Sequence, residues 1–129
     1  MKLYRIALDK SGSICQGTYS VEGFEKVSDM LQAIAEVLKV LDGKVKGMQL
    51  HTENGEIVID HFAEAVKLLE SFGKTDSIGE DSLFVSGIYG DERIVIEFPL
   101  KVNKFLSVSA KGRRIVMLVE RELYEVFEK

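Results

Sequence analysis

Residues 24–41, FEKVSDMLQAIAEVLKVL, decide the fold because they form the longest amphipathic pattern in the chain. At about 100° per residue, seven apolar side chains form one stripe: Phe24, Val27, Leu31, Ile34, Ala35, Leu38 and Leu41. Four more widen that stripe: Met30, Ala33, Val37 and Val40. The apolar arc then spans roughly 220°, whereas a helix that rests on one sheet needs little more than about 100°. The surplus flank therefore needs a cover, either another helix of the chain or another molecule.

The composition fits one globular domain over residues 1–129. The chain has 46% hydrophobic and 29% charged residues, which is enough to bury a core. It has neither an N-terminal apolar run of signal-peptide length nor a stretch near the roughly 18 apolar residues of a membrane span. A single cysteine, Cys15, excludes an internal disulfide framework and fits a reducing compartment. We therefore expect a cytoplasmic protein without a membrane span.

A hairpin precedes the organising helix. Residues 2–8 and 13–21 alternate like strands, with Tyr4, Ile6 and Leu8 on one face. Ser20 is a candidate cap for the helix, and Gly43 is a natural end because glycine adopts the left-handed conformation without steric cost.

A second hairpin is predicted over residues 46–60. Its turn is Asn54-Gly55, which is typical of a type I′ turn with positive φ at both central positions. That turn sets three pairings: Thr52 with Ile57, His51 with Val58, and Leu50 with Ile59. The face that holds Met48, Leu50 and Thr52 is then expected to point inward.

The second half of the chain continues the pattern of hairpins and helices. A shorter helix is predicted over residues 61–72, with Asp60 as its cap, Gly73 as its end and one apolar stripe: Phe62, Ala65, Val66, Leu69 and Phe72. A hairpin follows over 82–89 and 92–98, and its inward face holds Leu83, Val85, Gly87, Ile94, Ile96 and Phe98. In the tail, residues 104–110 form a strand. The five consecutive apolar residues 115–119 favour another strand before a short terminal helix over 120–129, although one helix over 114–129 is the alternative.

These elements predict an α+β domain. Its antiparallel sheet has six to eight strands built from hairpins, and one long and two shorter helices lie mainly on one face of the sheet.

No motif dictates a chemistry. His51 and His61 are expected to point apart, which argues against a metal site. Glu53, Glu56 and Asp60 lie around an exposed turn rather than in environments that would separate their pKa values. Gly73-Lys74-Thr75 closes a helix instead of opening one, so it is no phosphate-binding loop, and nothing pairs Cys15 with a base. We predict no catalytic residue, metal or cofactor.

Charge is distributed unevenly. The chain carries a net charge of −4, yet residues 99–114 contain five basic residues and no acid: Lys101, Lys104, Lys111, Arg113 and Arg114. This basic stripe, which includes Phe105, could bind an anionic ligand, a nucleic acid or an acidic protein surface. It could equally be a solvated hairpin whose cations prevent edge pairing. The acidic pI of about 5.3 speaks against a dedicated nucleic-acid binder.

Residues 4–60 resemble the roadblock and dynein-light-chain family. The resemblance rests on RIALDKSGSICQGT, on the long helix with its broad apolar surface, and on MQLHTENGEIVI. It implies a non-catalytic homodimer that pairs through the long helix and the adjoining strand and serves small GTPases. The family's first helix is missing here, the helix over 61–72 is extra, and the tail from Leu83 is longer.

The leading prediction is a non-catalytic binding or scaffolding protein that forms a homodimer through the helix 24–41. Its interface would include the surplus flank, namely Met30, Ala33, Val37 and Val40. The alternative is a binder of an anionic ligand or nucleic acid through residues 101–114. A small enzyme with an unrecognised site is the third hypothesis.

Overall fold

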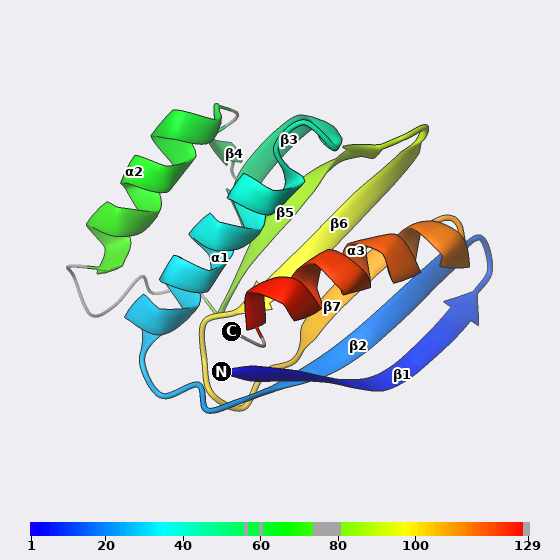
Figure 1. Cartoon of the computed structure of the whole chain (residues 1–129), viewed down its shortest axis with the longest axis horizontal. Coiled ribbons are helices and arrows are strands. Elements are labelled where there is room, and N and C mark those ends of the chain that lie inside the picture. Colours follow the sequence, from blue (N-terminus) through cyan, green and yellow to red (C-terminus); the bar gives the residue numbers. More distant parts are fainter. Residues whose placement is uncertain (56, 60, 74–80, 128–129) are drawn as a thin grey trace.

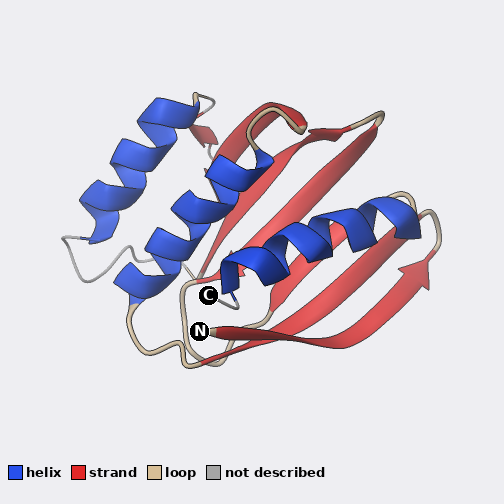
Figure 2. Cartoon of the chain, viewed as in Figure 1, coloured by secondary structure: helices blue, strands red, loops and turns tan. Residues whose placement is uncertain are grey.

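The computed structural model describes residues 1–55, 57–59, 61–73 and 81–127. Within these residues, seven strands form one antiparallel sheet in the order β1-β2-β7-β6-β5-β3-β4, and three helices lie on one of its faces (Figures 1 and 2). The predicted α+β fold is confirmed. Predictions that concern Glu56, Asp60, Lys74 and Thr75 lie outside the described residues.

Three hairpins supply six of the strands. They are β1 (Lys2–Ser11) with β2 (Ile14–Glu22), β3 (Val45–Thr52) with β4 (Ile57–Ile59), and β5 (Ser82–Tyr89) with β6 (Glu92–Pro99). The last strand, β7 (Leu106–Ala110), pairs with β2 on one side and β6 on the other. It therefore joins the two halves of the sheet.

The first hairpin departs from its predicted alternation. The register shifts between Arg5 and Ala7, which places a bulge at Ile6. Leu3 is buried, while Tyr4 and Ile6 are exposed. The prediction that Tyr4, Ile6 and Leu8 share one face is therefore wrong, because the bulge breaks the two-residue period.

The turn of the second hairpin also differs. Gly55 donates its N–H to the Thr52 carbonyl at 3.0 Å, and it has φ +80°, whereas no described residue other than glycine has positive φ. Asn54 therefore does not adopt the conformation that a type I′ turn requires. The positive φ of Gly55 instead accommodates one additional residue in the loop of the hairpin. Leu50 pairs with Ile59 as predicted, but His51 pairs with Ile57 instead of Val58.

The organising helix, α1 (Val27–Leu41), begins three residues later than predicted. Its N-cap is Lys26, whose side chain makes no capping hydrogen bond, so Ser20 does not cap it. It ends before Gly43, which has φ +85°, as the sequence predicts for a helix C-terminus. Because α1 links β2 to β3 at the far side of the sheet, it crosses the middle of the helical layer (Figure 1).

The C-terminal tail is one helix, α3 (Arg113–Phe127). The predicted strand over 115–119 is wrong, and the alternative of a single helix is the correct one. The buried residues of α3 follow a helical period: Ile115, Val116, Val119, Glu120, Leu123 and Phe127. Five apolar residues in a row fit either structure by period alone, since only packing decides which of them are covered.

The helices lie side by side in the order α2 (Phe62–Gly73), α1, α3 (Figure 1). The core lies between them and the sheet, and its strand side includes the predicted inward residues of the third hairpin, Leu83, Val85, Ile94, Ile96 and Phe98.

Within the described residues, no helix covers the opposite face of the sheet (Figure 2). By register, its central rows combine short polar residues with larger ones such as Phe84, Val95 and Glu97. The short polar residues are Thr18, Ser107, Ser109, Ser82 and Ser86, of which the last two are buried. Among the same residues, none of the helices is long and apolar enough to cross a membrane.

Candidate functional site

The predicted interface flank of α1 is covered within the chain. Met30, Ala33 and Val37 are 0%, 8% and 1% exposed, and Val40 is half-buried. Helix α3 packs along this flank (Figure 1). Ala33, Val126 and Phe127 line a surface hollow of about 310 Å³ that remains between the two helices. The assignment of these residues to a dimer interface is therefore wrong, because an internal helix already satisfies them.

The predicted basic stripe is divided in two. Lys101 and Lys104 precede β7, whereas Lys111, Arg113 and Arg114 follow it. Five residues of extended chain separate the two groups by roughly 16 Å. A single anion-binding stripe over 101–114 is therefore not formed.

The second basic group surrounds the N-terminus of α3. Arg113 and Arg114 lie in its first turn, where cations oppose the helix dipole, and no acidic residue accompanies them there. The anion at this position comes from β6, because the Gly112 N–H donates to Glu92 Oε1 at 2.6 Å. A carboxylate of the chain thus already occupies the place that a bound anion would take.

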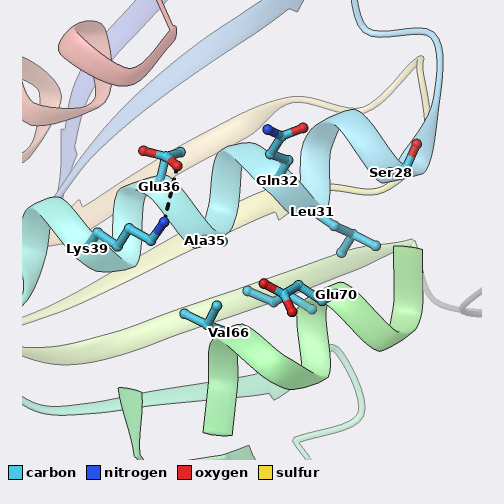
Figure 3. A pocket seen from close by; sticks show the side chains of 9 residues that line it. Ser28, Leu31, Gln32, Ala35, Glu36, Lys39, Val66 and Glu70 are labelled. Carbon is cyan, nitrogen blue, oxygen red and sulfur yellow. Dashed lines mark hydrogen bonds and ion pairs between the residues drawn. The ribbon is translucent and has the colours of Figure 1, made fainter. Parts of the chain in front are cut away.

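The other flank of α1 is open. Between α1 and α2 lies a groove with a volume of about 520 Å³ (Figure 3). Its walls come from both helices: Ser28, Leu31, Gln32, Ala35, Glu36 and Lys39 from α1, and Val66, Leu69 and Glu70 from α2. We call this feature the α1–α2 groove.

The α1–α2 groove has an apolar floor and a polar rim. Leu31, Ala35 and Leu69 are buried, so Val66 is the one of these four apolar side chains that stays partly exposed. On the rim, Glu36 and Lys39 form an exposed ion pair with an N–O distance of 3.4 Å (Figure 3). Glu70 stands on the opposite side and leaves the rim with a net charge of −1. An apolar side chain with basic neighbours suits such a groove.

The chain has one buried polar cluster, formed beneath α3 by described residues. Arg5 of β1 donates to both oxygens of Glu120, from Nε at 2.6 Å and from Nη2 at 2.7 Å, and Glu120 raises the pKa of that guanidinium. The Tyr19 hydroxyl has no hydrogen-bond partner among the described residues, and burial, followed by nearby Glu120, raises its pKa. Its ring lies over Gly17, where a Cβ atom would come within 2.5 Å of the hydroxyl. The cluster fastens α3 to β1 and β2.

The candidates for chemistry remain apart. His51 stacks on Phe84 with ring centroids 5.4 Å apart, on the uncovered face of the sheet, and Cys15 is buried as a free thiol. Among the described residues, no three His, Cys, Asp or Glu side chains converge as metal ligands would. Glu53 is exposed at its turn.

Sequence reasoning missed the α1–α2 groove, although its apolar members were recognised. Leu31 and Ala35 belong to the predicted stripe of α1, and Val66 and Leu69 to that of residues 61–72. The pattern predicted that both pairs would be covered, but it gave no information on how closely the two helices approach each other.

Comparisons of the chain with family models, with curated proteins and with solved structures found no match. The resemblance of residues 4–60 to the roadblock family thus stays a prediction.

Proposed function

We propose that this chain is a non-catalytic binding protein that self-associates through α1, using the side of the helix that faces α2. The observation that carries this proposal is the α1–α2 groove, an unfilled space with an apolar floor on the organising helix. Self-association through the long helix is also what the roadblock resemblance implies. The contact residues are now the groove residues that are at least partly exposed, in place of the covered flank: Val66, Glu70, Gln32, Glu36 and Lys39.

The buried titratable groups support a binding role over catalysis. Glu120 is the most buried carboxylate of the described residues, and Arg5 holds both of its oxygens. Acid or base chemistry would first have to break that pair, which is costly for a buried charge. We further propose a cytoplasmic location, which the single buried thiol of Cys15 supports.

The size of the groove limits what it can contribute. A stable dimer buries about 800 Å² on each partner, whereas one apolar side chain in a groove contributes on the order of 1.5 to 3 kcal/mol. Association must also overcome the lost freedom of two molecules. Two symmetric contacts, together with the flanking rims, are therefore needed for a dimer that persists at micromolar concentration.

Sedimentation equilibrium tests the proposal with two matched variants. Val66→Lys places a charge inside the groove, while Ser71→Lys places the same charge on an exposed part of α2 outside it. We expect a dimer for the wild type and for Ser71→Lys, and a monomer for Val66→Lys. A wild-type monomer throughout the micromolar range, or a Val66→Lys dimer of unchanged affinity, would contradict the proposal.

A further inference from the structure

The turn between β6 and β7 presents two exposed apolar side chains. Val102 and Phe105 are 60% and 54% exposed, the first of these being the most exposed large hydrophobic residue described. Between them and the sheet, Leu100 is buried and donates its N–H to the Asp81 carbonyl at 2.8 Å. We call residues 101–105 the β6–β7 knob.

The β6–β7 knob is ordered by its own backbone. Lys104 donates its N–H to the carbonyl of Lys101 at 3.2 Å, which closes a turn. The ammonium of Lys101 forms an ion pair with Asp81, which raises the pKa of the lysine. A turn held in this way loses little conformational freedom when it binds, so it is a favourable shape for insertion.

The chemistry of the knob complements that of the groove. The knob offers an exposed aromatic ring and Val102, with Lys101 and Lys104 beside them. The α1–α2 groove offers an apolar floor and a rim with one excess negative charge, carried by Glu70 opposite the Glu36–Lys39 pair.

We propose that the partner that fills the α1–α2 groove is the β6–β7 knob of a second copy of this chain, with Phe105 inserted between the helices and Lys104 facing Glu70. This inference rests on the proposed function and names its partner. The groove is lined by α1 and α2 alone, so the knob of the same chain does not occupy it.

Two copies can satisfy both surfaces at once. In a two-fold arrangement, the knob of each copy enters the groove of the other, so the dimer contains two identical junctions. Each junction removes one exposed Phe105 ring from water and fills one groove. The exchange provides the pair of contacts that the proposed dimer requires.

A mixing experiment between two single variants tests the inference. Phe105→Ser removes the knob's ring and keeps the groove, and Val66→Lys blocks the groove and keeps the knob. We expect each variant alone to be monomeric, with self-association at least about tenfold weaker than in the wild type. Mixed at equal concentration, the two should form a 1:1 complex that is weaker than the wild-type dimer but tighter than the self-association of either variant, since it keeps one of the two junctions intact. Sedimentation equilibrium with one variant labelled by a fluorophore measures this complex.

The control for Phe105→Ser is Ile6→Ser, which removes a side chain of nearly equal exposure, 55%, from β1. We expect it to stay dimeric. If Phe105→Ser also stays dimeric while Val66→Lys does not, the knob is not the partner, although self-association through the groove stands. If the two variants associate no more tightly when mixed than each does alone, reciprocal exchange is overturned. A monomeric wild type would overturn both the inference and the proposed function.

Discussion

The two flanks of α1 differ although the same helix provides both. Toward α3, Met30 and Val37 are fully covered, and the Arg5–Glu120 pair fastens the covering helix to the sheet. Toward α2, the helices leave a groove of about 520 Å³ between nearly buried floor residues. Among the described residues, neither α2 nor α3 forms an ion pair with α1. Both flanks keep a hollow at the surface, about 520 Å³ toward α2 and about 310 Å³ toward α3, so they differ in the size of the space that a partner could enter.

The comparison shows that the width of an apolar arc indicates only how much of a helix surface must be buried, and not which neighbour buries it. The arc of α1 is wide because two helices, and not one, lie beside it in the same layer (Figure 1). Which side remains accessible depends on how closely each neighbour packs. In this chain the flank toward α2 has the larger of the two hollows.

The largest expected effect comes from a charge placed on the closed flank. Val37→Asp should lower the free energy of unfolding by about 4 kcal/mol, because a carboxylate would be buried without a partner. Urea unfolding followed by circular dichroism measures this change. A loss below about 1 kcal/mol would mean that α3 does not cover this flank in solution.

Removing the fastening should have a smaller effect. In Glu120→Ala, the guanidinium of Arg5 loses its acceptor, and the space beneath α3 is left unfilled. Since the Arg5 side chain is 35% exposed, water compensates in part, and we expect a loss of about 2 kcal/mol. Relative to the wild type, this variant should show a larger increase in the hydrogen-exchange rate of the α3 amides than of the α2 amides. Equal changes in both helices would argue against a specific role in holding α3.

The buried hydroxyl of Tyr19 predicts a loss of stability in alkaline solution. Its folded-state pKa is raised, so above about pH 10 the unfolded chain loses this proton while the folded chain keeps it. Unfolding is then favoured by up to about 1.4 kcal/mol for each pH unit above that point. Tyr19→Phe should remove this part of the slope, because the other tyrosines are unchanged. It should also leave stability at pH 7 equal or slightly higher, since the buried hydroxyl has no hydrogen-bond partner among the described residues. The same slope in both proteins would contradict the assignment.

The smallest effect on stability is expected in the groove. Val66→Lys should change the free energy of unfolding of the monomer by less than about 1 kcal/mol, since the lysine stem can lie along the groove while its ammonium reaches water. Urea unfolding at submicromolar protein concentration separates the free energy of unfolding of the monomer from the free energy of dimer dissociation. A loss comparable to that of Val37→Asp would show that the α2 side is as tightly packed as the α3 side.

Much of the fold follows from local patterns in the sequence. The third hairpin, the strand at 104–110, the shorter helix and the glycine at the end of α1 all depend on alternation, period and turn chemistry within a few residues. The bulge at Ile6 and the turn at Asn54-Gly55 differ from prediction because one extra residue in a strand leaves little trace in composition.

The principal errors share one cause. Residues 115–119 were assigned to a strand, which left no helix long enough to cover the flank of Met30 and Val37. That flank therefore appeared to require another molecule. The cap that begins α3 joins Gly112 to Glu92, twenty residues earlier in the chain, and such a contact cannot be read from local spacing. The α1–α2 groove depends on the distance between two helices, so the sequence could name its floor residues but not its presence.

A cysteine crosslink between two copies tests most directly whether the open flank of α1 receives a second molecule. Asn103→Cys in one copy and Glu70→Cys in the other place thiols on the β6–β7 knob and on the rim of the α1–α2 groove and leave Phe105 in place, while Cys15 stays buried. After mild oxidation of the mixture, we predict a covalent 1:1 heterodimer joined through positions 103 and 70. The same knob variant mixed with Ser71→Cys should give far less product. Equal yields from the two mixtures, or no dimer in either, would contradict the account.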